Sequence, residues 1–302
     1  MSPFPKGTQY IFSGKSAIAV ILRFLRHERV LNDKSAQVLV SEWLGTWVYM
    51  TMHAYCFPTM VMNKKVRALM VYHQWGFPQH MEAIEKFART HKLYLIEDCA
   101  HTIDSTYNGK RVGTFGRVAL WSLSKFFSTP VGGALSAKDR KLRQFVAREY
   151  RHHDKRCERE VMQGLRKGGT EVARAYAVYD RLTKCPAAAK AVALLEYKKG
   201  AVEVRRRNFE MLRKAVWGTK EEKLMTNSTV VPWMVPLFCG AKNALVARAL
   251  ERAGFESGVY HFDVNRNMLN PRFVECVALP CHQALSVRDI ERIIQIVRKT
   301  QG

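Results

Sequence analysis

The sequence is poor in acidic residues and contains no long apolar run. Its 26 aspartates and glutamates stand against 49 lysines and arginines, which gives a formal charge of +23. No stretch reaches the ~18 uninterrupted apolar residues that a membrane span needs. The N-terminus also lacks the basic segment and apolar run of a secretory signal. These absences predict a cytoplasmic protein, in the host cytoplasm if the source is viral, with no membrane association.

Two common site motifs are missing as well. None of the seven cysteines is paired at CxxC spacing, so we expect reduced thiols and no metal site. The GxxxxGK phosphate loop of nucleotide-hydrolysing enzymes is absent. With 302 residues, 47% of them apolar, the chain is long enough to bury a sizeable core.

The positive charge exceeds what a substrate with two or three negative charges requires. A polyanion such as DNA would exploit it, because each phosphate contact releases condensed counterions. A generally basic protein would have the same composition, so both interpretations stay open. The nucleic-acid interpretation places candidate contacts in a basic helical region, at Arg151, Lys155, Arg156, Arg205, Arg206 and Arg207.

Apolar strands and amphipathic helices alternate along the first half of the chain. This alternation predicts an α/β fold whose large domain has a mostly parallel sheet flanked by helices. The helices are expected over 17–25 and 81–91, and the strands over 36–40, 67–72, 92–96, 110–112, 118–122 and 133–136, with a hairpin turn at Asn108-Gly109.

In the second half of the chain, the pattern of charged and apolar residues changes near residue 220. A basic helical region over 139–216, broken at Pro186, precedes a strand over 230–237, a helix over 243–253, a strand over 258–260 and a helix over 287–299. We therefore expect a large domain over 1–220 and a smaller C-terminal α/β domain over 221–302.

Three segments carry residues suited to chemistry. An apolar strand delivers Asp98 at its C-terminal end, where ligands of open α/β sheets bind. Lys125 follows another strand amid apolar and hydroxyl residues, where desolvation frees its amine for a Schiff base. The turn Ser13-Gly14-Lys15-Ser16 opens the first helix, whose N–H groups and dipole can hold a phosphate. Taken singly, each has a structural explanation: a loop cap, a solvated lysine and a helix N-cap.

Together these segments resemble the DegT/DnrJ/EryC1/StrS aminotransferase family. The family's SGTxAL segment is similar to residues 13–18 (SGKSAI). Its VH.yG strand and turn is similar to 71–84, its IEDaAha segment to 96–122, and the spacing from its lysine to GG to that from Lys125 to Gly132-Gly133. Its closing LPlh segment is similar to residues 279–293. The resemblance is strong over 12–20 and 67–136 and weak between 136 and 276.

The resemblance implies a pyridoxal 5′-phosphate (PLP) enzyme of fold type I, built as a homodimer. By that resemblance Lys125 binds the cofactor covalently, Asp98 pairs with the ring nitrogen, and His101 lies beside the ring. The phosphate is held by Ser122 and the Ser13–Ser16 turn, including Gly14 and Lys15. A tryptophan, Trp43 or Trp47, stacks on the ring.

Departures from the family pattern leave the substrate open. Arg117 stands where the family usually has Asp, the segment before Lys125 is shorter, and no Asn-Tyr-Arg segment reaches toward a neighbouring subunit. We therefore expect first a PLP enzyme, a decarboxylase or an aminotransferase, acting on an amino-acid-modified base of nucleic acid, as in viral DNA hypermodification. The alternatives are a sugar-nucleotide aminotransferase acting on a keto-sugar, and a catalytically silent DNA-binding or regulatory protein.

Overall fold

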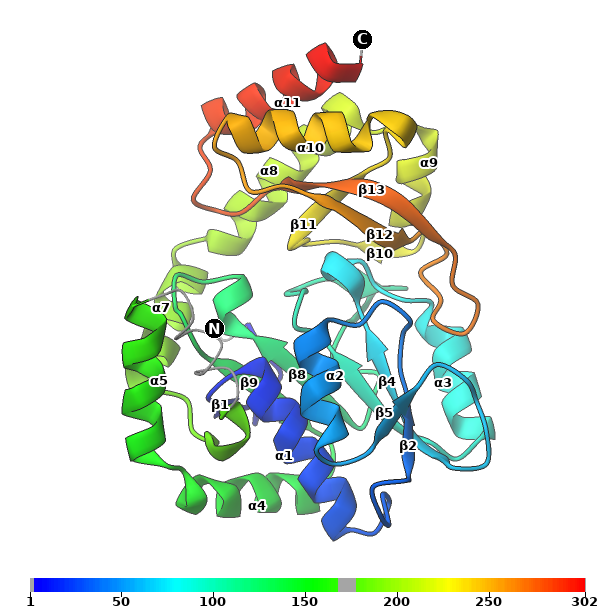
Figure 1. Cartoon of the computed structure of the whole chain (residues 1–302), viewed down its shortest axis with the longest axis vertical. Coiled ribbons are helices and arrows are strands. Elements are labelled where there is room, and N and C mark those ends of the chain that lie inside the picture. The colour runs from blue at the N-terminus through cyan, green and yellow to red at the C-terminus, as the bar shows by residue number, and fades with distance from the viewer. Residues whose placement is uncertain (1–2, 168–177, 302) are drawn as a thin grey trace. The chain divides into compact units, whose positions relative to one another are not determined.

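The computed structural model describes residues 3–167 and 178–301, and the chain divides into two compact units (Figure 1). The first unit comprises residues 1–72, 85–100 and 113–196, and the second comprises 73–84, 101–112 and 197–302. The main change of unit therefore falls between Glu196 and Tyr197 rather than near residue 220. The reason is that α8 (Ala201–Val216) buries Phe209 and Leu212 in the core of the second unit.

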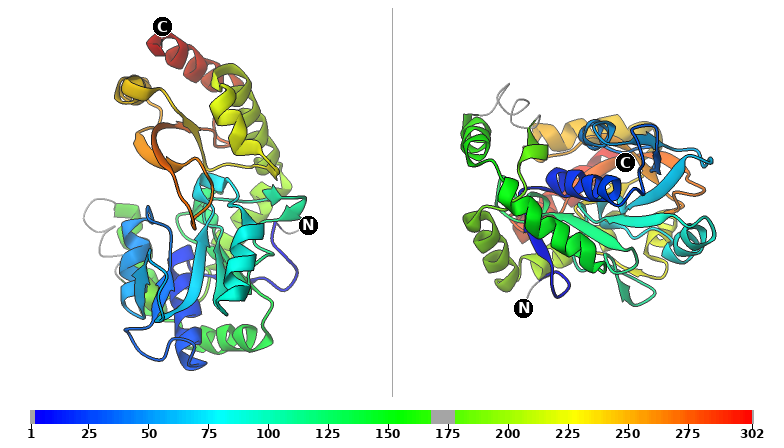
Figure 2. Two further views of the ribbon diagram at one scale, coloured as in Figure 1. Left: turned by 90° about the vertical axis from the view of Figure 1, so that its right-hand side faces the viewer. Right: turned by 90° about the horizontal axis from the view of Figure 1, so that it is seen from below.

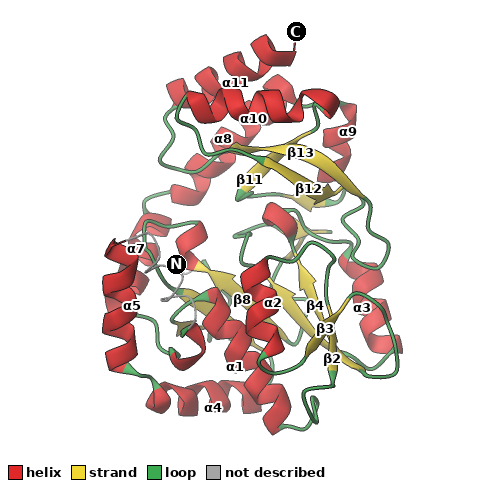
Figure 3. Cartoon of the chain, in the orientation of Figure 1, coloured by secondary structure: helices red, strands yellow, loops and turns green. Residues whose placement is uncertain are grey.

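A seven-stranded sheet forms the centre of the first unit (Figure 3). Its order is β1-β9-β8-β5-β4-β2-β3, and β9 runs antiparallel to both of its neighbours, while the remaining strands share one direction. The mostly parallel sheet expected from the sequence is confirmed. Its strands are β1 (Gln9–Ile11), β2 (Gln37–Leu39), β3 (Phe57–Thr59), β4 (Val66–Tyr72), β5 (Tyr94–Asp98), β8 (Val118–Ser122) and β9 (Gly133–Ala137).

Helix α1 (Gly14–His27) is the main helix packed on this sheet. Ser13 caps its first turn by accepting a hydrogen bond from the Ser16 backbone N–H at 3.0 Å. Nearly every residue from Ala17 to Leu25 is buried, and α1 packs against β8, β9 and α4 (Arg140–Glu149) (Figure 2). Other α-helices described in this unit are α2 (Thr46–His53) and α5 (Lys155–Lys167). Helix α7 (Ala187–Lys198) begins in the first unit and ends in the second, and α3 (Met81–Thr90) begins in the second and ends in the first.

A buried carboxylate fixes the loop between β5 and β8. Glu97 accepts hydrogen bonds from the backbone N–H groups of Gly113 at 2.8 Å and Gly116 at 2.6 Å. Gly113 has φ of +88° and lies against the Trp121 ring, so a side chain there would be both strained and obstructed. Glu97 thereby holds β8 beside β5 and is a structural residue of this segment.

The second unit contains two small antiparallel sheets. One has the order β10-β6-β7 and includes the predicted hairpin, with Asn108 (φ 48°) and Gly109 (φ 72°) at its turn. The other has the order β11-β13-β12 and is covered by α8, α10 and α11. Its elements are β6 (Thr106–Tyr107), β7 (Lys110–Arg111), β10 (Ser228–Thr229), β11 (Met234–Leu237), β12 (Val259–Asp263), β13 (Phe273–Pro280), α9 (Thr219–Glu222), α10 (Asn243–Arg252) and α11 (Val287–Gln301).

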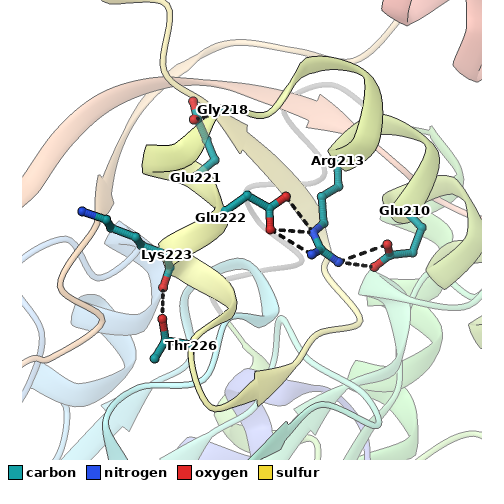
Figure 4. A network of polar contacts seen from close by, with 7 residues as sticks. All are labelled: Glu210, Arg213, Gly218, Glu221, Glu222, Lys223 and Thr226. Carbon is teal, nitrogen blue, oxygen red and sulfur yellow. Dashed lines mark hydrogen bonds and ion pairs between the residues drawn. The ribbon is translucent and has the colours of Figure 1, made fainter.

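An ionic contact ties α8 to α9 in this unit (Figure 4). Arg213 donates to Glu222 at 2.8 Å and to Glu210, one turn earlier on α8, at 3.1 Å. Beside it, Glu221 accepts from the backbone N–H of Gly218 and of Phe238. Within residues 3–167 and 178–301, no helix is at once long and apolar enough to cross a membrane.

Arg205 corrects one expectation about nucleic-acid contacts. Its side chain is only 2% exposed, and it donates to the carbonyls of Pro232 at 3.2 Å and Trp233 at 3.1 Å and to the Gln283 amide oxygen at 2.9 Å. A buried guanidinium bonded in this way cannot reach a phosphate backbone. Arg205 is instead a structural residue that joins α8 to the segment before β11.

Arg205→Ala is expected to lower the free energy of unfolding by about 2–4 kcal/mol, because it empties buried volume and leaves buried carbonyls unpaired. The neighbouring Arg206 is exposed, and Arg206→Ala is expected to change the free energy by less than about 0.5 kcal/mol. Urea unfolding of both variants measures the difference, and equal stability of the two would contradict the structural role of Arg205.

Candidate active site

The expected catalytic residues follow strands that end at one edge of the large sheet. β5 ends at Asp98 and β8 ends at Ser122, and the two strands are parallel, with Asp98 beside Leu120. The turn η2 (Leu123–Lys125) continues directly from β8 and carries Lys125. Because β1 runs in the same direction, Ser13 lies at this carboxyl edge as well.

Close backbone contacts bring the start of α1 against the ends of β8 and β9. Ser13 bridges Gly132, and a Cβ added at Gly133 would lie 2.5 Å from the Ser13 carbonyl carbon. A Cβ added at Gly14 would lie 3.3 Å from the Ser122 Cβ. The structure therefore brings together Ser13, Gly14 and Ser122, and the two glycines at 132–133 make this approach possible.

Two lysines share this edge. The ammonium group of Lys15 lies over the Trp47 ring, 5.1 Å from its centroid, and over the Tyr179 ring, 4.7 Å from its centroid. Burial, and secondly the positive charge of Lys125, lower the pKa of Lys15 to about 7. An anion that binds between or beside the two lysines would offset both effects, because its negative charge stabilises their ammonium forms. The first turn of α1 lies at the positive end of the helix dipole and offers that anion a binding position.

The hydroxyl groups of the turn have different partners. Ser16 donates to the Tyr179 carbonyl at 2.7 Å and is 1% exposed, so its hydroxyl hydrogen is committed within the protein. Ser13 lies 2.9 Å from the Ser16 hydroxyl and can donate either to it or to a ligand. The phosphate-binding group that the geometry favours is thus Ser13, Lys15, Ser122 and the helix N-terminus, with Ser16 in a supporting position.

Asp98 is 2% exposed at the end of β5. One of its carboxylate oxygens accepts from the Ala100 backbone N–H at 2.9 Å. That bond is the loop cap expected from the sequence as the structural interpretation. A second oxygen of the same carboxylate suits a protonated ring nitrogen, so the loop cap and the cofactor role are compatible.

The structure places the tryptophan and histidine candidates in different surroundings. Trp43 is 49% exposed on the segment before α2, whereas Trp47, on α2, is the tryptophan whose ring contacts Lys15. His101 belongs to the second unit, where its ring lies 4.2 Å from that of Trp233, centroid to centroid, at 33°. Tyr179 and Trp233 were not expected from the sequence, because each lies in a region with weak family resemblance.

The basic residues proposed for nucleic acid are divided between the two units. Arg151, Lys155 and Arg156 are exposed on the first unit, and Arg156 pairs with Glu160 at 3.0 Å. Arg206 and Arg207 are exposed on α8 of the second unit. Part of this charge is neutralised along helices, as the spacing of acids in the region allows.

A mostly parallel sheet with a lysine, a buried aspartate and a capped helix N-terminus at its carboxyl edge defines a PLP enzyme of fold type I. Over residues 59–298 the chain matches the DegT/DnrJ/EryC1/StrS aminotransferase family. The chain belongs to this family, whose cofactor is PLP. The glycine contacts, the N-terminus of α1 and the Lys15–Lys125 pair fit the phosphate and aldehyde of that cofactor.

Two curated relatives of the chain are named for nucleotide-linked amino sugars. It is 39% identical over 82 residues to GDP-perosamine synthase of Escherichia coli O157:H7, covering 26% of this chain and 22% of that protein. It is 37% identical over 98 residues to dTDP-3-amino-3,6-dideoxy-alpha-D-galactopyranose transaminase of Aneurinibacillus thermoaerophilus, covering 31% and 27%. The chain thus spans about a quarter of the length of these curated relatives.

Solved structures share the fold over nearly the whole chain. The aminotransferase TlmJ from Streptoalloteichus hindustanus superposes with a TM-score of 0.71 at 16% identity, over 97% of this chain and 85% of that one. Helicobacter pylori PseC, described as an aminotransferase of pseudoaminic acid biosynthesis, gives a TM-score of 0.70 at 14% identity, over 98% and 86%. The expected fold type I is confirmed.

Lys15→Thr, which restores the hydroxyl of the family's SGT segment, is expected to weaken PLP binding by about tenfold and to leave binding of pyridoxal, which lacks the phosphate, unchanged. The wild-type preference for PLP should be largest below about pH 7. It should decline as the pH rises, because phosphate binds the protonated Lys15, whose pKa is about 7 in the free protein. Fluorescence titrations with both compounds from pH 6 to 9 measure this preference. An unchanged preference in Lys15→Thr would exclude the phosphate contact.

Proposed function

We propose that this chain is a PLP-dependent aminotransferase that transfers an amino group to a nucleotide-linked keto-sugar. The observation that carries the proposal is the arrangement of Asp98, Ser122, Lys125 and the Ser13–Gly14 turn at one edge of the sheet. It is supported by family membership and by relatives whose names state activated amino sugars.

The residues at this edge have distinct roles in the proposed reaction. When bound, PLP withdraws electrons from the carbon that carries the transferred amino group. Asp98 keeps a proton on the ring nitrogen, and its burial at 2% exposure keeps that pair away from water. Lys125 holds the cofactor and afterwards moves a proton at the reacting carbon. Lys15, Ser13 and the first turn of α1 fix the phosphate and so orient the ring.

The named relatives favour the sugar-nucleotide substrate over the nucleic-acid substrate, which is the reverse of the order expected from the sequence. None of those named above is described as a decarboxylase or as a nucleic-acid enzyme. The observation that still favours a nucleic-acid substrate is the charge of +23. One of its six proposed contacts, Arg205, is buried, and Arg156 is paired with an acid. We therefore retain a modified base of DNA as the second candidate substrate.

Substrate assays distinguish the two candidates. Purified protein loaded with PLP is incubated with GDP- or dTDP-linked keto-sugars and with glutamate or glutamine as donor. Mass spectrometry is expected to show the amino sugar nucleotide. Lys125→Ala and Asp98→Asn should each reduce turnover by at least about a hundredfold, because each removes a proton-transfer or electron-withdrawing function.

The matched control is Ser128→Ala, an exposed residue three positions after Lys125 that is expected to keep turnover within about twofold. A parallel reaction contains duplex or single-stranded DNA bearing an amino-acid-modified thymine and is analysed as nucleosides. Conversion of the DNA with no amination of any keto-sugar would replace the sugar substrate by the second candidate.

A symmetric homodimer is the proposed assembly. Large apolar side chains are exposed on the first unit between residues 43 and 62, among them Met50, Phe57, Met60 and Val61. A second copy of the chain would remove this apolar surface from water. Light scattering of the purified protein tests the assembly, and an active monomer would contradict it.

A further inference from the structure

A second site with strong positive charge lies at the opposite edge of the large sheet. A cavity of about 480 Å³ opens where β4, β5 and β8 begin, away from the edge that carries Asp98 and Lys125. All of its lining residues belong to the first unit. The cations that line it are Arg67, Arg89, Lys92, Arg117 and Lys138.

The backbone of the sheet fixes where these cations stand. The Arg117 N–H donates to the Leu95 carbonyl at 2.9 Å, and the Lys138 N–H donates to the Arg117 carbonyl at 2.9 Å. Lys92 lies in the tight turn from α3 into β5, with φ of 53°, and its N–H donates to the Arg89 carbonyl at 3.2 Å. The five charges therefore gather because of the strand register, although they are far apart in the sequence.

Little acidic charge balances this group. Glu85 lines the cavity. Asp139 is near enough to Tyr94 to raise the pKa of its hydroxyl. Asp139 also caps α4, because its carboxylate accepts a hydrogen bond from the Lys141 backbone N–H. Among the residues that the structure describes, none of the five cations forms an ion pair. The arrangement places like charges around one cavity, which disfavours the empty site and favours an anion.

A buried tyrosine belongs to the wall of the cavity. Tyr94, at the start of β5, lines the cavity and is 5% exposed, and its hydroxyl has no hydrogen-bond partner within the described part of the chain. Burial raises the pKa of Tyr94, so the hydroxyl stays protonated and is a donor. The guanidinium of Arg117 lies over the same ring, 5.4 Å from its centroid.

We propose that this cavity binds a small molecule with a diphosphate group, at a site separate from that of the cofactor. Phosphate oxygens suit the guanidinium and ammonium donors, and two linked phosphates match several cations better than a single phosphate does. Apolar side chains of Val30, Ala88, Leu93 and Phe115 form the remaining wall. The diphosphate can therefore come from inorganic pyrophosphate or from a nucleoside diphosphate, whose base would cover that wall.

Calorimetric titration of the PLP-loaded enzyme with pyrophosphate, and separately with ADP, tests the proposal. Arg117→Asp reverses one charge in the cavity and is expected to weaken pyrophosphate binding at least about tenfold. The matched control, Arg151→Asp, reverses the charge of an exposed arginine in the same unit and should leave the affinity unchanged. Affinity in the wild type should fall with added salt.

Thermal unfolding shows whether Arg117→Asp folds. Lys138→Gln is a second cavity variant, and it provides the same test if Arg117→Asp does not fold. Tighter binding of ADP than of pyrophosphate, with the same loss in the cavity variants, would assign the site to a nucleoside diphosphate. Equal or weaker binding of ADP would assign it to the inorganic ion. Absence of binding by either compound, or equal affinity in the cavity variants and Arg151→Asp, would overturn the proposal. Because the measurement is binding, its outcome does not depend on the proposed aminotransferase activity.

Discussion

The close approach of two backbone segments at Gly133 determines the rest of the active site. With no side chain at Gly133, the Ser13 carbonyl and the Gly14 N–H lie directly against the start of β9. The first turn of α1 is thereby held beside Ser122, at the end of β8. A side chain at position 133 would push these segments apart. The N-terminus of α1 would then no longer lie beside Ser122 and Lys125. A phosphate bound at the helix N-terminus would no longer be held close to the lysine.

Electrostatics complements this backbone contact. Lys15 and Lys125 converge in a partly buried position, and the pKa of Lys15 is lowered to about 7 as a result. Two neighbouring positive charges repel each other, and an anion bound beside them would offset this repulsion. The aromatic rings of Trp47 and Tyr179 confine Lys15 and direct it.

The large positive charge of the chain has several structural origins. Arg205 is buried in the second unit, Arg213 joins two helices through two glutamates, and Arg156 pairs along its own helix. The cations at the amino edge of the sheet differ from these because they surround a cavity and lack acidic partners among the described residues. The positive charge of this protein thus includes structural contacts, a cavity lined by cations and exposed side chains, and the total of +23 does not by itself indicate a nucleic-acid partner.

The sequence by itself determined the elements near the cofactor. The period of apolar residues and the Ser-Gly cap predicted α1, β4, β5 and β8, and the family segments located Asp98, Lys125 and Ser122, because these depend on local spacing along the chain. It did not show the unit boundary at residue 197, the burial of Arg205 or the roles of Tyr179 and Trp47. It also did not show that residues from Arg67 to Lys138 surround one cavity. Those features arise from contacts between segments distant in sequence, and only the register of the sheet and the packing of helices on it decide which of them meet.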